Sequence, residues 1–295
     1  MNILFIIFNR PEETREVFAA IKKARPEKLF IAADGARSNR PKEAALCETT
    51  RAITKEIDWP CQVETRFQEH NLGCKKHVSS AISWFFEHVE EGIILEDDTV
   101  PDQSFFPFAQ EMLAKYRNDE RVMHISGTTF IPKSHATEPA ASYHFSRYAH
   151  VWGWASWRRA WNKYDIDMKN IGGLEKDAAA FSRERDREYW IRFFRHMKEK
   201  QVDTWDAQWQ YTIRSVQGLC ITSNVNLVRN IGFGETATHT KTTANGMLPA
   251  EHMARVATTA TTNVDEKADA YLMDKVYIPT FFKKISTKIR HLLID

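Results

Sequence analysis

The run Gly92-Ile93-Ile94-Leu95-Glu96-Asp97-Asp98 changes from wholly apolar to wholly acidic within a few residues. Its apolar part, residues 92–95, predicts a short strand buried on both faces, as strands are in the parallel sheets of α/β proteins. Its three carboxylates follow at the carboxyl end of that strand, which is the edge where open α/β sheets bind ligands. The run therefore predicts an α/β fold with an acidic site at one sheet edge.

The first 125 residues surround this run with short apolar segments that alternate with amphipathic segments of helical length. This alternation is typical of parallel strands joined by crossover helices. Helices are expected from Pro11 onward, after the turn at residues 71–73, and at 41–57, 184–200 and 204–217. Strands are expected at residues 3–8, 29–33 and 62–67. We therefore predict a βαβα arrangement, an α/β fold with helices packed on its sheet.

The overall composition excludes several classes of protein. A total of 41 Lys and Arg against 39 Asp and Glu leaves a formal charge of +2, too small for a protein that binds nucleic acid by neutralising phosphates. Hydrophobic residues make up 43% of the chain, enough for a packed core. The cysteines form no C-x-x-C pair, which argues against a disulfide scaffold or a structural zinc site; they are Cys47, Cys61, Cys74 and Cys220.

The ends of the chain suggest a cytoplasmic location. The opening apolar run is too short for a signal peptide, and no segment approaches the ~18 apolar residues that span a bilayer. The last fifteen residues, 281–295, place apolar side chains on one helical face and Lys and Arg on the rest. This basic amphipathic helix either contacts an anionic membrane surface peripherally or packs on its own domain or a second subunit.

Three adjacent carboxylates repel one another unless a cation, hydrogen bonds or solvent relieve them. Glu96, Asp97 and Asp98 are thus a candidate site for a divalent cation with a phosphate ligand, the alternative being a solvated turn. Asp34 ends an earlier strand of the same predicted sheet, so it should face the same crevice. Arg10 ends the first strand and would add positive charge for a diphosphate.

Residues 93–106, which include Glu96-Asp97-Asp98, resemble the E-D-D form of the D-x-D motif in GT-A glycosyltransferases. The resemblance is closest to the eukaryotic N-acetylglucosaminyltransferases that initiate complex N-glycans, and bacterial transferases of surface-polysaccharide pathways show a similar pattern. Asn9-Arg10, Ala33-Asp34-Gly35 and the helical His77 are similar to that family's nucleotide-binding positions.

Further similarity lies downstream. Trp152-Gly153-Trp154 is similar to an aromatic G-W segment of the family. Residues 229–239 are similar to part of a loop that closes over the sugar donor in that family. The family's W-D-D-W segment, whose second Asp is the catalytic base, is matched by Trp205-Asp206-Ala207-Gln208-Trp209, with one Asp and a longer spacing.

The resemblance implies a GT-A, Rossmann-like α/β fold with a mixed sheet flanked by helices. It also implies an inverting, metal-dependent transfer of N-acetylglucosamine or another hexose. The donor would be a UDP-sugar, and the acceptor a hydroxyl of a glycan or lipid-linked glycan in bacterial surface polysaccharide synthesis. Asp206 would be the base, and Asp98 would bind Mn²⁺ or Mg²⁺. The resemblance implies nucleotide-sugar contacts for Arg10, Asp34, His77, Glu96, Asp97, Trp154, Phe233, Gly234 and His239.

The residues themselves leave other interpretations open. His77 is also suited to a structural role, Trp154 to the core, and Asp206 to the acidic first turn of a helix. A non-catalytic nucleotide- or carbohydrate-binding protein is one alternative function. A sugar-nucleotide pyrophosphorylase is another, although residues 9–12 lack the G-x-G-T-R loop of that class. Along the chain we expect a nucleotide-sugar half (1–125), an acceptor and catalytic half with a mobile loop (126–262) and a basic tail (263–295).

Overall fold

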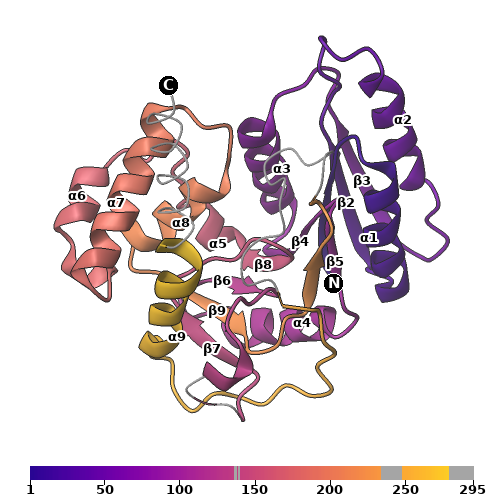
Figure 1. The fold of residues 1–295 in the computed structure, drawn as a ribbon. Coiled ribbons are helices and arrows are strands. Elements are labelled where there is room, and N and C mark those ends of the chain that lie inside the picture. The colour runs from indigo at the N-terminus through magenta and orange to yellow at the C-terminus, as the bar shows by residue number, and fades with distance from the viewer. Residues whose placement is uncertain (136–137, 139, 234–247, 279–295) are drawn as a thin grey trace, which may run out of the picture.

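The computed structural model describes residues 1–135, 138, 140–233 and 248–278. Its central feature is an eight-stranded mixed sheet with the strand order β3-β2-β1-β4-β8-β6-β9-β7 (Figure 1). The strands are β1 (Asn2–Ile7), β2 (Lys28–Ala33), β3 (Gln62–Phe67), β4 (Glu91–Glu96), β6 (Val122–Ser126), β7 (Tyr143–Ser146), β8 (Trp154–Trp157) and β9 (Leu219–Ser223). The sheet confirms the predicted mixed α/β fold, and it runs without interruption across residue 125.

The sheet is parallel at one end and mixed at the other. β3, β2, β1 and β4 pair in parallel, and β8 pairs antiparallel with both β4 and β6. β9 is parallel to β6, and β7 is antiparallel to β9. A separate two-stranded ribbon joins β5 (Thr99–Pro101) to β10 (Val228–Asn230), which brings residues 231–233 beside the acidic run.

Helices cover both faces of the sheet because its strands alternate apolar side chains between two cores. One core contains Phe5 and Leu95 and is covered by α1 (Pro11–Ala24), α2 (Glu43–Ile53) and α4 (Phe105–Lys115). The opposite core contains Leu4 and Ile94 and is covered by α3 (Cys74–His88), α5 (Arg158–Trp161) and α8 (Asp206–Ser215).

A third core lies where α8 meets the helices beside it, whose arrangement Figure 1 shows. It includes buried residues of α8, α6 (Ile171–Lys176), α7 (Glu184–Glu199), α9 (Glu266–Tyr271), the 3-10 turn Ala178–Ala180 and the π-helix Leu272–Tyr277. A further 3-10 turn, Lys133–His135, has no buried residue. Ala268, Leu272 and Met273 are buried in the third core, so residues 266–273 belong to the folded body. The amphipathic segment 281–295 lies outside the described residues. No helix in the described ranges is long and apolar enough to cross a membrane.

The predicted elements around the acidic run are confirmed with small shifts of their ends. α2 is shorter than expected because the chain turns at Thr54, whose backbone N–H bonds to the Arg51 carbonyl. α1 begins at Pro11, as predicted, with Glu12 and Glu13 in its positively polarised first turn. β8, formed by the tryptophan-rich segment, was not among the predicted strands.

Candidate functional site

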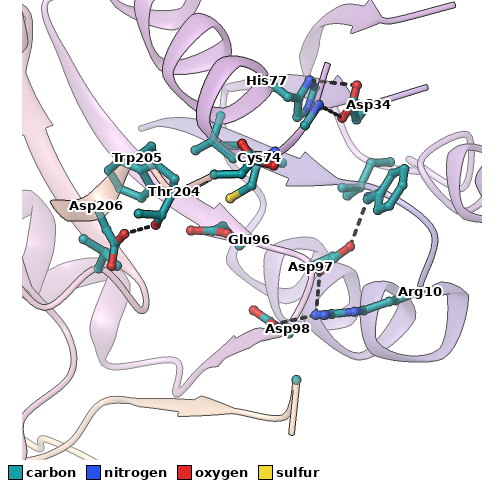
Figure 2. Close-up of a pocket in the computed structure, with 18 of the residues that line it drawn as sticks. Arg10, Asp34, Cys74, His77, Glu96, Asp97, Asp98, Thr204, Trp205 and Asp206 are labelled. Atoms are coloured by element: carbon teal, nitrogen blue, oxygen red, sulfur yellow. Dashed lines mark hydrogen bonds and ion pairs between the residues drawn. The ribbon is translucent and has the colours of Figure 1, made fainter. Parts of the chain in front are cut away.

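A cavity of about 390 Å³ opens at the carboxyl ends of β1 and β4. It lies between the start of α3 and the loop 203–206 that leads into α8 (Figure 2). Most of the residues predicted from the sequence line this one cavity: Arg10, Asp34, His77, Glu96, Asp97, Asp98, Asp206 and Phe233. The structure therefore brings together side chains from both halves of the chain.

The Arg10 guanidinium lies against two of the three acids. Its Nη1 is 2.7 Å from Asp98 Oδ2 and 3.6 Å from Asp97 Oδ1, and the Phe8 backbone N–H donates to Asp97 Oδ2 at 3.0 Å (Figure 2). Parallel pairing of Ile6 with Glu96 aligns the two strand ends and so creates these contacts. Burial and repulsion by Asp98 raise the pKa of Asp97 to about 7, against the opposing effect of Arg10.

Glu96 points into the cavity, toward Thr204 and Asp206 (Figure 2). Within the described residues its carboxylate accepts no hydrogen bond, and burial together with repulsion from Asp98 and Asp97 raises its pKa well above the usual value. Among the described residues, Arg10 is the cationic side chain that pairs with Asp97 and Asp98. Mutual repulsion and burial favour the protonated forms of Glu96 and Asp97, and a bound cation would favour their ionised forms.

These oxygen donors suit Mg²⁺ or Mn²⁺ in chemical type. No group of three or more His, Cys, Asp or Glu among the described residues is arranged to hold a metal ion by itself. A Mg²⁺-type site commonly uses one or two carboxylates and completes its shell with substrate phosphates and water. Asp98, on the cavity wall, fits that kind of site.

Asp34 organises the turn before α3. Its Oδ1 accepts from the backbone N–H groups of Gly35 and Leu72, and its Oδ2 from Gly73 N–H and the Asn71 side chain, at 2.9–3.2 Å. A carboxylate offers about four acceptor positions, so these donors occupy Asp34 fully. A nucleotide base in the cavity would therefore pack beside Asp34 more readily than bond to it.

His77 is buried in the cavity wall beside Asp34. Its Nδ1 lies 3.8 Å from Asp34 Oδ1, and neither ring nitrogen reaches a hydrogen-bond partner in the described part of the chain. Burial, helped by the charges of Arg66 and Arg51, lowers its pKa to about 4. Burial therefore favours the neutral ring, which offers one donor and one acceptor nitrogen.

Asp206 is the first residue of α8 and is exposed to solvent at the cavity. Thr204 Oγ1 donates to Asp206 Oδ1, and buried Trp205 anchors the loop by stacking on Trp154 with ring centroids 5.6 Å apart. The carboxylate is therefore held on a rigid helix end and faces Glu96 across the cavity (Figure 2).

Asp203 is a cavity residue that the sequence reasoning missed. Its carboxylate accepts from Cys74 N–H at 3.0 Å and from Lys75 N–H at 2.8 Å, in the first turn of α3. The signal available in the sequence was the start of that helix, Gly73-Cys74-Lys75-Lys76, which has no acid or hydroxyl of its own to cap it. Its N–H groups need a partner from elsewhere in the chain.

The structure corrects the position of Trp154. This side chain is fully buried between the sheet and α8, where it stacks on His124 and Trp205, and it does not line the cavity. The aromatic wall comes instead from Trp152, whose ring meets Phe233 edge-on at 5.7 Å. β8 is paired with β4 and β6 on its two edges, and Trp154 packs in the core under α3, α5 and α8.

The segment after β10 closes one side of the acidic cluster. Ile231 N–H donates to the Asp98 carbonyl at 2.8 Å, and a Cβ atom on Gly232 would lie 2.0 Å from Asp98 Oδ2. Only glycine fits so close to that carboxylate. The other two predicted residues of this loop, Gly234 and His239, lie outside the described residues.

No protein-family model and no curated protein match this sequence. Among solved structures, mouse xyloside xylosyltransferase 1 is similar at a TM-score of 0.38 and 9% identity, over 74% of this chain and 82% of the other. The galactosyltransferase LgtC, in complex with donor and acceptor sugar analogs, is similar at a TM-score of 0.37 and 10% identity, over 76% of this chain and 86% of the other. A UDP-glucose pyrophosphorylase complexed with UDP-glucose is similar at a TM-score of 0.35 and 9% identity, over 75% of this chain and 89% of the other. Likenesses this weak do not assign the chain to a family.

Proposed function

We propose that this protein is a GT-A glycosyltransferase that moves a hexose from a UDP-sugar to a hydroxyl of a glycan or lipid-linked glycan, with inversion at the anomeric carbon. The observation that carries the proposal is the two-sided cavity. A cationic and acidic cluster at residues 10 and 96–98 lies on one side, and the exposed carboxylate of Asp206 on the other. A diphosphate and an acceptor hydroxyl need these two environments.

The leaving nucleoside diphosphate gains negative charge as the glycosidic bond breaks, so its site must be cationic. Arg10 would bind a diphosphate oxygen, because a guanidinium matches phosphate oxygens in geometry and charge. When bound at Asp98, Mn²⁺ or Mg²⁺ would supply further positive charge to the leaving group. The Glu96 side chain, whose carboxylate has no hydrogen-bond partner among the described residues, would accept from the ribose or the sugar.

The acceptor hydroxyl must lose its proton as its oxygen attacks. Asp206 would accept this proton on the face opposite the leaving group, and attack from that face inverts the anomeric carbon. The Thr204 hydroxyl orients the carboxylate by donating to Oδ1, which leaves Oδ2 for the acceptor. Trp152 and Phe233 form an aromatic wall on which the apolar face of a sugar ring would pack.

The preference for uridine rests on the similarity of Asp34 and His77, in sequence, to nucleotide-binding positions of the N-acetylglucosaminyltransferases. Because four donors already occupy the Asp34 carboxylate, we assign it a positioning role toward the turn 71–73. His77 is the group that would contact the nucleotide. Phe233, Gly234 and His239 are proposed to cover the donor, and the pathway we favour is bacterial surface polysaccharide synthesis.

The test is release of UDP from UDP-N-acetylglucosamine and other UDP-hexoses by the full chain, with Mn²⁺ and a panel of glycan acceptors. Asp206→Asn should lower turnover by roughly 10²–10⁴-fold, the usual contribution of a positioned base, and leave UDP affinity unchanged. Asp167→Asn is the matched control at an exposed acid outside the cavity. The anomeric configuration of the product, read by NMR, checks inversion.

Two outcomes would replace this proposal. UDP binding with no turnover of any UDP-sugar by the unmodified chain would favour a non-catalytic binding protein. Formation of UTP from a UDP-sugar and pyrophosphate would favour a pyrophosphorylase.

A further inference from the structure

The strand β3 forms an open edge of the large sheet. It pairs with β2 on one side, and no other strand of the described chain pairs with its outer side. Two of its apolar side chains are partly exposed at this edge, Val63 by 40% and Phe67 by 37%. An unpaired edge carrying apolar side chains is a template for another strand.

The direction of each backbone group on β3 follows from its pairing with β2. Gln62 N–H donates to the Glu27 carbonyl and Gln68 N–H to the Ala33 carbonyl. Because backbone groups alternate in direction along a strand, the even-numbered residues bond to β2 and the odd-numbered ones point outward. The outward N–H and C=O groups are those of Val63, Thr65 and Phe67.

The sequence of β3 is complementary to itself in one antiparallel register. With a two-fold axis through Thr65, each Thr65 faces the other across the pair, and Val63 faces Phe67 of the second copy. All of the outward-pointing residues then occupy hydrogen-bonded positions, as an antiparallel ladder requires. Glu64 falls opposite Arg66, where side chains are closest and opposite charges stabilise the pair.

Shifting the two-fold axis by one residue removes this complementarity. An axis through Glu64 places that carboxylate opposite its own copy, and an axis through Arg66 does the same for the guanidinium. Like charges in directly opposite positions destabilise a strand pair. Both the opposite charges of Glu64 and Arg66 and the apolar contact of Val63 with Phe67 therefore favour the register whose two-fold axis passes through Thr65.

The side chains on the two faces of β3 are already held in suitable positions. Arg66 Nη1 donates to the Ser80 carbonyl of α3 at 2.7 Å, which fixes this guanidinium on the α3 face. Phe67 lies on the opposite face under Arg51 of α2, whose guanidinium carbon is 5.2 Å from the ring centroid. A second strand would thus meet an ordered edge and lose little further side-chain entropy there.

We propose that the occupant of this edge is a second copy of the same chain, joined through antiparallel pairing of β3 with β3 about Thr65. The two sheets then continue into one another across the two-fold axis, an interface in which the same strand serves both partners. The cavity opens at the carboxyl ends of β1 and β4, and none of the outward-pointing residues Val63, Thr65 and Phe67 lines it.

The first test is the mass of the full chain in solution by sedimentation from low micromolar to millimolar concentration. The expected mass rises from 34.3 kDa toward twice that value. Thr65→Pro should hold the mass at one chain, because it removes an outward N–H that β2 does not use, a position where an edge strand tolerates proline. Thr65→Val, which keeps the N–H, should dimerise like the unmodified chain.

The second test fixes the register and does not depend on the proline variant folding. Facing residues at a hydrogen-bonded position lie about 5.5 Å apart between Cα atoms, within reach of a disulfide. Thr65→Cys should therefore form a covalent dimer under mild oxidation. Val63→Cys should not form one alone, since its copy is displaced by about 13 Å along the strand, but it should cross-link when mixed with Phe67→Cys.

The proposal is overturned if the unmodified chain keeps a mass of 34.3 kDa at all concentrations. It is equally overturned if a dimer forms that Thr65→Pro does not weaken although circular dichroism shows it folded. Cross-linking through Val63→Cys alone, with none through Thr65→Cys, would place the partner in a different register and also reject it.

Discussion

Asp34 and Asp203 together hold four consecutive backbone N–H groups at the start of α3. Asp34 accepts from Leu72 and Gly73, and Asp203 accepts from Cys74 and Lys75. These two acids come from opposite halves of the chain, and both line the cavity. The start of α3 is thus one place, at the cavity, where the predicted nucleotide half and the predicted catalytic half are joined by hydrogen bonds.

Removing Asp203 should loosen that junction. Asp203→Ala deletes two hydrogen bonds to a helix N-terminus, so we expect a loss of about 1–2 kcal/mol in the free energy of unfolding. Asp203→Asn, which can still accept, should lose less. Urea unfolding measures both, and Asp167→Ala at an exposed acid is the control. Equal midpoints for Asp203→Ala and the control would show that the cap contributes nothing.

Replacing Arg10 should weaken nucleotide diphosphate binding selectively. Arg10→Gln removes the guanidinium that lies 2.7 Å from Asp98, so the acids repel a diphosphate without compensation. We expect UDP affinity to fall by roughly 10–100-fold, the scale of one or two charge-assisted hydrogen bonds. Arg15→Gln, on the exposed side of α1 near Glu56, should leave the affinity unchanged. Calorimetric titration compares the two, and equal affinities would contradict the role of Arg10.

Adding one methyl group beside Asp98 should impair the site without unfolding the protein. Gly232→Ala places a Cβ atom 2.0 Å from Asp98 Oδ2, so either the carboxylate or residues 230–233 must move. We expect a clear loss of metal-dependent UDP binding with a nearly unchanged unfolding midpoint. Gly172→Ala is the matched control, since no atom lies within 4 Å of its added Cβ. Unchanged UDP binding in Gly232→Ala would show that the close contact between Gly232 and Asp98 does not matter for the site.

The buried histidines should make the fold sensitive to acid. His124 Nδ1 accepts from Trp209 Nε1–H and its Nε2–H donates to the His150 carbonyl, so the ring must be neutral. Burial lowers its pKa to about 3. Its contribution to stability is complete above the ordinary pKa of about 6.5 and is lost as the pH falls toward 3.

The corresponding measurement is the free energy of unfolding as a function of pH. Below pH 6.5, the free energy of unfolding of His124→Gln should change less steeply with pH than that of the unmodified chain. The difference in slope should reach up to about 1.4 kcal/mol per pH unit, since glutamine cannot take up the proton. The variant will be less stable at neutral pH, so the slope and not the midpoint is the readout. An identical slope in the two proteins would mean that His124 is protonated in the fold.

Local sequence patterns predicted most of the parallel half of the sheet. β1, β2, β3 and β4 are each short apolar or alternating runs bounded by turn residues, and such a pattern needs no knowledge of distant partners. Their parallel pairing then places Arg10, Asp34 and residues 96–98 at one edge. That part of the candidate site follows from strand order and from the position of the charges.

Contacts between distant segments were not predictable in the same way. Asp203 caps a helix that begins 129 positions earlier in the chain, and no local pattern near residue 203 predicts this contact. Trp152 and Trp154 look alike in the sequence. Trp154 lies in β8 and is buried under helices from distant parts of the chain, whereas Trp152 precedes the strand and lines the cavity. Long-range topology decided each of these cases.

The most direct test of the central claim, that this cavity binds a nucleoside diphosphate with a divalent cation, is thermal unfolding of the full chain with UDP, GDP, CDP or dTDP, each with and without Mn²⁺. Saturation at a hundred times the dissociation constant stabilises a protein by about 2.7 kcal/mol. We predict a clear rise in the unfolding temperature with UDP and Mn²⁺ together, a smaller one with either alone, and loss of the combined effect in Asp98→Ala. An unfolding temperature that no nucleotide shifts, with or without Mn²⁺, would contradict the claim.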